Sequence, residues 1–191
     1  MKRILLASQS PRRVELIRYI TDDFTAVSSD VDETFDPALS CEDNTMHAAY
    51  LKAAAQRHML EEGYDLIVGA DTCVYACGEV LGKPKDAADA FRMLRMLSGR
   101  THSVFTGVCI ISPEQTLTFS EETRVTFRDL SDGEILRYIE TGEPNDKAGA
   151  YAIQGGARIF IERIGGNYEN VVGLPATKLY EVIRDVFGNL K

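Results

Sequence analysis

The chain has 191 residues, of which 45% are hydrophobic and 26% charged, and its formal net charge at pH 7 is -8. These proportions are typical of a globular protein that is long enough to bury a sizeable core. The acidic balance argues against nonspecific binding to nucleic acid or to a membrane surface, because both need basic patches. It still allows a small anionic substrate that is held by a few local cations.

The first apolar run is too short for the core of a signal peptide, and no stretch approaches the length of a membrane span. We therefore expect a cytoplasmic protein that makes no use of a membrane. Free, buried thiols are expected for the four cysteines, because Cys41, Cys73, Cys77 and Cys109 form no CxxC pair. The three histidines are scattered and are expected to be ordinary surface or core residues.

The N-terminal stretch predicts a strand, a tight turn and a helix. Residues 4–7 form an apolar run, residues 8–10 are polar, and Ser10 with Pro11 suits the cap and first position of a helix. Arg12 and Arg13 then fall in the first helical turn, where the helix dipole disfavours cations. Either an anion binds there or the two arginines are solvated on a surface helix.

Two polar residues stand out in the next part of the chain. A helix is expected from Ser40 or Asp43 to Glu62, and Lys52 borders its apolar stripe, so Lys52 either points to solvent or reaches into a cleft. Asp71 interrupts a strand predicted over residues 66–76. A carboxylate there is costly unless it is paired, binds a metal or is satisfied by backbone N–H groups.

The remaining sequence predicts an α/β fold with a mixed sheet. The expected elements are a strand at 24–30, an acidic loop at 31–37 with Glu33, a helix from 86 to 99, strands at 103–111 and 116–127 in a hairpin, a helix from the capping box 131–134 to Gly142, a strand at 158–164 and a last helix opened by Pro175. Pro84 disfavours helix at Lys83, which is placed on an extended segment. No linker or repeat divides the chain, so residues 1–191 are expected to form a single domain.

Six charged residues suit a metal-assisted phosphate site. The cations are Arg12, Arg13, Lys52 and Lys83, and the carboxylates are Glu33 and Asp71. Cations can hold phosphate oxygens, while carboxylates hold Mg²⁺ or Mn²⁺ or orient water. No Walker A pattern, GxGxxG or metalloprotease signature competes with this interpretation.

Eight segments in order along the chain carry a resemblance to a known family. They are Leu6–Arg13 (LASQSPRR), Gly69–Thr72 (GADT), Gly82–Pro84 (GKP), Leu97–Gly99 (LSG) with His102, Thr106–Val108 (TGV), Asp146–Tyr151 (DKAGAY), Ile153–Gly155 (IQG) and Val172–Pro175 (VGLP). The chain resembles the Maf family of nucleoside triphosphate pyrophosphatases over essentially its whole length. The resemblance implies a mixed twisted sheet with flanking helices, similar to Maf and inosine triphosphatase folds, with an active-site cleft between two lobes. It also implies a homodimer.

The resemblance further implies hydrolysis of a nucleoside triphosphate to the monophosphate and pyrophosphate. It assigns the proton acceptor to Asp71 and the choice of base to Arg12, Thr72 and Gln154. Together with the charged set above, this predicts catalytic roles for Glu33, Lys52 and Lys83 as well, a divalent metal, Mg²⁺ or Mn²⁺, at Glu33 and Asp71, and a substrate-binding set of Ser8, Arg12, Arg13, Thr72 and Gln154. Whether Asp71 is a base or chiefly a metal ligand is left open.

Three positions distinguish branches of that family. The branch acting on 7-methyl-GTP tends to carry Trp between Pro and Arg-Arg, Ser-Asp-Gln for Ala-Asp-Thr, and Glu for Gln. This chain has Pro11-Arg12-Arg13, Ala70-Asp71-Thr72 and Gln154, so it resembles the dTTP/UTP branch, with Ala152 a small departure where the family often has Gly. The amide of Gln154 can pair with the O4/N3–H edge of thymine or uracil. The alternatives are a nucleotide-binding regulator of cell division (septum formation) with weak catalysis, and a pyrophosphatase of other base specificity, such as 7-methyl-GTP.

Overall fold

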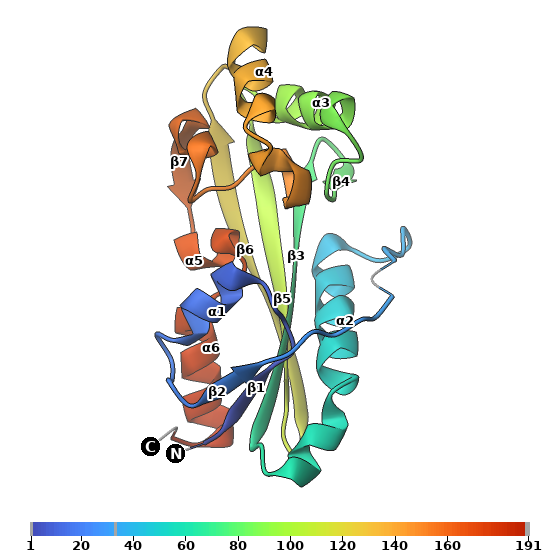
Figure 1. Ribbon diagram of the computed structural model, residues 1–191, viewed down its shortest axis with the longest axis vertical. Coiled ribbons are helices and arrows are strands. Elements are labelled where there is room, and N and C mark those ends of the chain that lie inside the picture. Colours follow the sequence, from blue (N-terminus) through green and yellow to red (C-terminus); the bar gives the residue numbers. More distant parts are fainter. Residues whose placement is uncertain (1, 33, 190–191) are drawn as a thin grey trace. The chain divides into compact units, whose positions relative to one another are not determined.

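The computed structural model describes residues 2–32 and 34–189, and these residues contain a seven-stranded mixed sheet (Figure 1). The strand order is β2-β1-β3-β5-β6-β7, and β4 pairs with β3. The strands are β1 (Ile4–Leu6), β2 (Phe24–Ala26), β3 (Leu66–Ala76), β4 (Glu79–Leu81), β5 (Thr101–Ile111), β6 (Thr116–Phe127) and β7 (Ile161–Gly165). Strand β1 is parallel to β2 and β3, while β4 and β7 are antiparallel to their partners. The predicted α/β class with a mixed sheet is confirmed.

The described residues form six α-helices, three of which begin at capping side chains that the sequence predicts. They are α1 (Pro11–Ile17), α2 (Cys41–Ala54), α3 (Ala87–Leu97), α4 (Asp132–Glu140), α5 (Tyr168–Val172) and α6 (Ala176–Val182), with 3-10 turns η1 (Arg57–Glu62), η2 (Glu143–Asp146), η3 (Ala148–Ala150) and η4 (Gly156–Phe160) and a π turn η5 (Ile183–Phe187). The hydroxyl of Ser40 caps α2, the carboxylate of Asp86 caps α3, and Ser131 with Glu134 forms the predicted capping box of α4.

The chain forms two compact units. The first contains the residues up to Asp71, Thr106–Glu121 and the residues from Gly173 onward, and the second contains Thr72–Phe105 and Glu122–Val172. Strands β3, β5 and β6 each contribute residues to both units.

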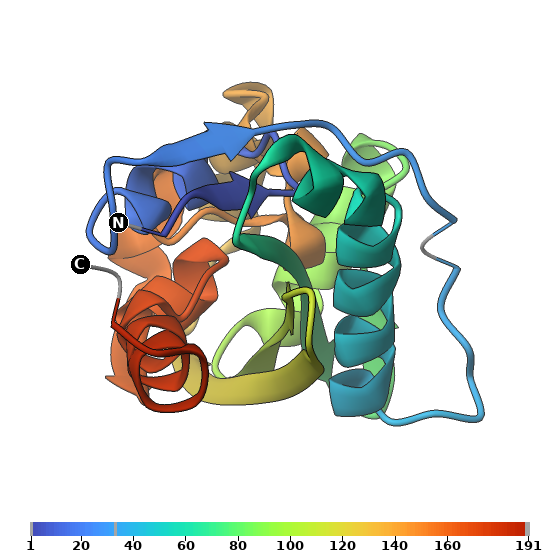
Figure 2. The ribbon, with the colours of Figure 1, turned by 90° about the horizontal axis from the view of Figure 1, so that it is seen from below.

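In the first unit, helix α2 packs directly on the sheet. A Cβ atom added to Gly69 of β3 would collide with the backbone of Ala49 and Ala53, and one added to Gly107 of β5 would collide with the backbone of Thr45. Only glycine permits this approach. The core on this side contains Leu5, Ala7, Ala49, Ala53, Tyr64, Ile67, Cys109 and Ile111. Figure 2 shows α2 on one side of these strands and α6 on the other.

In the second unit, an aromatic cluster forms much of the core. It consists of His102, Phe127, Tyr138, Tyr151 and Phe160, whose rings meet edge to face. The side-chain amide of Asn170 joins two strands of this unit, because it donates to the carbonyl of Val104 and to the hydroxyl of Thr123. These contacts fix the ends of β5 and β6 that belong to the unit.

Several predicted elements differ in extent. The helix expected to run to Glu62 ends at Ala54 and continues as η1 before Gly63, whose φ of 89° stops it. The strand expected from Arg158 begins only at Ile161, because residues 156–160 wind into η4. Strand β2 ends at Ala26, α1 ends at Ile17, and α5 was not predicted. The hairpin of β5 and β6 is confirmed, with the N–H of Ser112 bonded to the carbonyl of Gln115.

Candidate functional site

The turn after β1 ties Arg13 to the protein. Ser8 is buried, and its Oγ accepts hydrogen bonds from the N–H of Ser10 at 3.3 Å and from Nη1 of Arg13 at 3.4 Å. Nε of Arg13 donates to the carbonyl of Gly173 at 2.8 Å, within the same unit. Arg13 is therefore not a solvated surface arginine. Ser10 occupies the N-cap position before Pro11, as predicted, although its side chain forms no capping hydrogen bond.

Lys52 reaches inward and pairs with Asp71. The lysine residue is 6% exposed, and its Nζ donates to Oδ1 of Asp71 at 2.7 Å and to the carbonyl of Ala70 at 3.5 Å. The side chain of Asp71 is 20% exposed, so part of its carboxylate remains accessible. An aspartate inside an apolar strand is thus balanced by a buried ammonium group, which offsets much of the cost of burying either charge alone.

Ser8 and Asp71 lie just beyond the carboxyl end of the parallel pairing between β1 and β3. Leu6 of β1 is in register with Val68 of β3, and the N–H of Ala7 donates to the carbonyl of Val68 at 2.8 Å. Ser8 follows this pairing on β1, and Asp71 follows it on β3. Open α/β sheets bind ligands at the carboxyl ends of their strands. This part of the first unit is therefore a candidate phosphate site, with Arg12 half-buried in the first turn of α1.

Thr72, Lys83 and Gln154 belong to the second unit. Thr72 is half-buried on β3, directly after Asp71, whereas Lys83 and Gln154 are exposed. The segment before Lys83 is fixed, because the carbonyl of Gly82 accepts the N–H of Gly149 at 3.0 Å. Side chains exposed on an anchored backbone are suited to contact a ligand.

The donor chemistry of Asp71 fits a divalent metal bound together with a triphosphate. Mg²⁺ is usually held by one or two carboxylates, substrate phosphates and waters rather than by an all-protein cage. No three His, Cys, Asp or Glu side chains cluster in the part of the chain that the structure describes. Glu33, the other predicted metal ligand and catalytic residue, lies outside the described residues.

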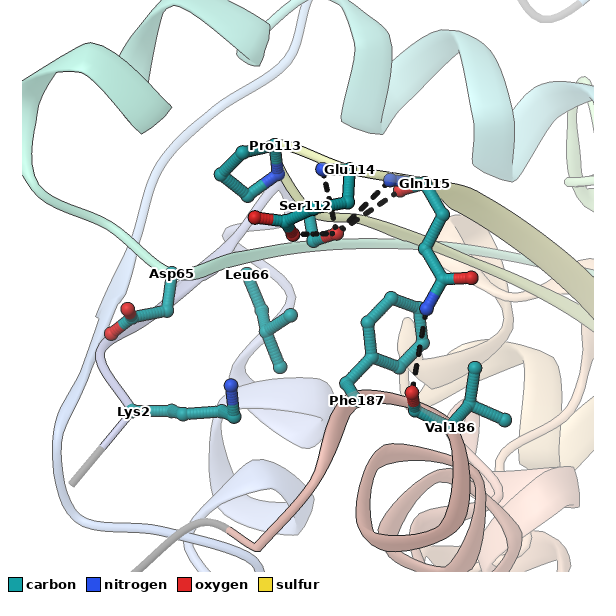
Figure 3. A pocket seen from close by; sticks show the side chains of 9 residues that line it. All are labelled: Lys2, Asp65, Leu66, Ser112, Pro113, Glu114, Gln115, Val186 and Phe187. Carbon is teal, nitrogen blue, oxygen red and sulfur yellow. Dashed lines mark hydrogen bonds between the residues drawn. The ribbon is translucent and has the colours of Figure 1, made fainter.

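A separate pocket of about 260 Å³ lies at the other end of β3 (Figure 3). It is lined by Lys2, Asp65, Leu66, Ser112, Pro113, Glu114, Gln115, Val186 and Phe187. Leu66 is the first residue of β3, whereas Asp71 lies farther along the strand. None of the predicted site residues lines this pocket, so it is not the candidate site.

Sequence reasoning missed the residues that hold the predicted ones in place. The carbonyl of Gly173, which fixes Arg13, lies in a segment matched by the resemblance but had no stated role. Tyr138 and Glu143 bind the backbone on both sides of Gln154, and neither was singled out. No sequence signal links them to Gln154, because their contacts arise only from the tertiary fold.

No helix among the described residues is long and apolar enough to cross a membrane.

The sequence has well-matched relatives. The model of the Maf-like protein family matches residues 3–186. The dTTP/UTP pyrophosphatase of Caldicellulosiruptor bescii is 49% identical over 183 residues, which cover 94% of this chain and 92% of the relative. The dTTP/UTP pyrophosphatase of Alkaliphilus oremlandii is 47% identical over 98% of this chain and 97% of its own. The Ham1 protein of Staphylococcus aureus aligns with a TM-score of 0.48 and 14% identity over 83% of this chain and 91% of that one, a likeness too weak to carry an argument.

Proposed function

This chain belongs to the Maf-like protein family, and we propose that it is a hydrolase, a nucleoside triphosphate pyrophosphatase that acts on dTTP and UTP. Relatives that are 47–49% identical over nearly their whole length are dTTP/UTP pyrophosphatases, which supports the reaction. The structural observation that carries the proposal is the Lys52–Asp71 pair, a buried ammonium beside a partly exposed carboxylate at the carboxyl end of a parallel strand pair.

In the proposed reaction, water attacks the α-phosphorus of the nucleotide. A bond forms between the water oxygen and that phosphorus, and the bond to the oxygen bridging the α- and β-phosphates breaks. The products are the nucleoside monophosphate and pyrophosphate. Asp71 accepts the proton of the attacking water or orients that water, while Lys52 holds its carboxylate in one position.

Charge on the triphosphate must be neutralised for this attack. In the proposal, Arg12, Arg13, Lys52 and Lys83 supply positive charge, and the hydroxyl of Ser8 lies beside the guanidinium of Arg13. A bound Mg²⁺ or Mn²⁺, held by Asp71 and Glu33, would supply further neutralisation. Arg12, Thr72 and Gln154 select the base, and the exposed amide of Gln154 has the donor and acceptor that the thymine or uracil edge requires.

The finer parts of the proposal follow from the family. We expect modified pyrimidine nucleotides to be hydrolysed as well, and the protein to be a cytoplasmic homodimer without affinity for nucleic acid. Light scattering that gives a monomeric mass at working concentrations would contradict the dimer.

Pyrophosphate release tests the function. The purified protein is incubated with Mg²⁺ or Mn²⁺ and, separately, with dTTP, UTP, CTP, 7-methyl-GTP and ITP. We expect turnover confined to dTTP and UTP. Asp71→Asn should reduce it by ~10² or more, because a neutral amide neither accepts the proton nor holds a metal as well. Asp22→Asn, a change at an exposed aspartate of the same unit, is the matched control and should retain full turnover.

The other outcomes separate the alternatives. Turnover of another base would keep the chemistry but show that Arg12, Thr72 and Gln154 do not select pyrimidines. Binding without turnover would favour the nucleotide-binding regulator. Normal turnover by Asp71→Asn would remove Asp71 from the mechanism.

A further inference from the structure

The loop that carries Gln154 is held at both ends by two side chains. The N–H of Ala152 donates to the hydroxyl of Tyr138 at 3.1 Å, and the N–H of Gly156 donates to both carboxylate oxygens of Glu143 at 3.1 and 3.0 Å. The hydroxyl of Tyr138 in turn donates to Glu143 at 2.9 Å. All of these residues belong to the second unit. One connected network therefore brackets Gln154.

Tyr138 is itself rigidly placed. It lies on α4, is 5% exposed, and its ring meets that of Phe160 edge to face at 5.2 Å. Burial raises the pKa of Tyr138, and its hydrogen bond to Glu143 adds to that effect, so the hydroxyl stays protonated and remains a donor to the carboxylate.

Two glycines let the loop lie against this pair. A Cβ atom on Gly155 would collide with the carboxylate of Glu143, and one on Gly156 would lie 3.4 Å from ring carbons of Tyr138. The side chain of Gln154, between these anchored points, is exposed. The backbone is thus fixed while the amide remains available.

We propose that Tyr138 and Glu143 are positioning residues that set the base selectivity of the site by fixing the loop that presents Gln154. The inference rests on the proposed function, in which Gln154 contacts the base. An exposed amide on a flexible side chain discriminates better between bases when its backbone is already held in place, because less of the loop has to be ordered when the base binds. The Tyr138–Glu143 pair supplies that restraint without touching the substrate.

The test compares Glu143→Gln and Tyr138→Phe with the unmodified protein, using dTTP and CTP as substrates. Each variant keeps the shape of the side chain but removes an acceptor or the bridging hydroxyl. We expect KM for dTTP to rise ~10-fold with kcat changed less than ~3-fold, and turnover of CTP, which is not expected in the unmodified protein, to become measurable. The amides of Ala152 and Gly156 should exchange hydrogen faster in both variants, a change independent of activity.

Ser131→Ala is the matched control, because it removes the cap of the helix that carries Tyr138 without touching the loop. It should lower the thermal midpoint and leave the base preference unchanged. An equal change of preference in this control would show general loosening of the unit and overturn the inference. If both loop variants keep the preference for dTTP, the inference is overturned while the function stands. If the unmodified protein hydrolyses no nucleotide, the function fails and the inference fails with it.

Discussion

His102 is a buried base whose protonation is disfavoured in the folded state. It is 3% exposed, its Nε2 pairs with the hydroxyl of Tyr151 at 2.9 Å, and its Nδ1 has no hydrogen-bond partner among the described residues. Burial lowers the pKa of His102 to about 4, below the ~6.5 of an unfolded chain. The unfolded state therefore binds more protons between these two values.

This difference predicts a loss of stability in acid. The free energy of unfolding should be unaffected by His102 above about pH 6.5 and should fall by ~3 kcal/mol as the pH drops to about 4. Urea unfolding at pH 7.5 and at pH 4 measures the change, and His102→Gln should make it smaller. His58→Gln, at an exposed histidine, should leave it as it is. An identical pH dependence in His102→Gln would contradict the prediction.

Lys52 should matter to both catalysis and stability. Lys52→Met leaves the carboxylate of Asp71 without its ammonium partner, so we expect turnover to fall ~10²-fold and the free energy of unfolding to fall by ~1–3 kcal/mol. Lys178→Met is the control, because Lys178 pairs with Glu121 in a more exposed position. It should cost less than ~1 kcal/mol and leave turnover intact. Urea unfolding and the pyrophosphate assay measure both variants. If Lys52→Met and Lys178→Met lower the free energy of unfolding and the turnover equally, the prediction for Lys52 is wrong.

At the scale of elements, the seating of α2 on the sheet depends on two glycines. Gly69→Ala and Gly107→Ala each place a Cβ atom against the backbone of α2, which cannot move aside as a flexible side chain would. We expect each to lower the free energy of unfolding by at least ~1–3 kcal/mol. Gly165→Ala, whose Cβ would meet nothing nearer than 4.0 Å, is the comparison and should be nearly neutral. Thermal unfolding of the three variants tests this expectation. It is wrong if Gly69→Ala and Gly107→Ala unfold at the same temperature as Gly165→Ala and the unmodified protein.

Local signals explain which elements could be predicted from the sequence. Ser131 and Glu134 start α4 where the capping box lies, and the alternation of residues 116–127 matches β6. Residues 158–160 were wrongly predicted as strand, because their apolar character is equally compatible with η4. The winding there depends on Gly156 bonding to Glu143, a tertiary contact without a local signature.

The candidate site was also predictable only in part: the sequence singled out its residues but not the contacts between them. Asp71 stood out because a carboxylate in an apolar strand needs a partner, but the residues alone did not identify Lys52 as that partner. Periodicity placed Lys52 beside the packed face of its helix and left two directions open. The close packing of α2 on β3, where Gly69 meets the backbone of Ala49 and Ala53, brings the lysine to Asp71. Such long-range pairing cannot be obtained from spacing along the chain.

At the scale of the whole molecule, the net charge of -8 predicts weak interaction with polyanions. Phosphate backbones bind proteins through clustered cations, and the four cations that the proposed function assigns to phosphate do not offset the overall charge. We expect no shift of single- or double-stranded DNA in a gel at 150 mM salt with the protein at ~10 μM, a concentration within the usual nonspecific range. A salt-sensitive shift at that concentration would contradict this prediction.

The turn between β3 and β4 gives the protein a ready attachment point for a probe. Cys77 is exposed there, contrary to the expectation of a buried thiol, whereas Cys41, Cys73 and Cys109 are buried, and none of the four forms a disulfide. A maleimide dye should therefore couple at one position without any engineered cysteine. Because β4 leads directly from this turn to Gly82 and Lys83, the fluorescence of such a dye would report nucleotide binding next to a segment expected to contact phosphate.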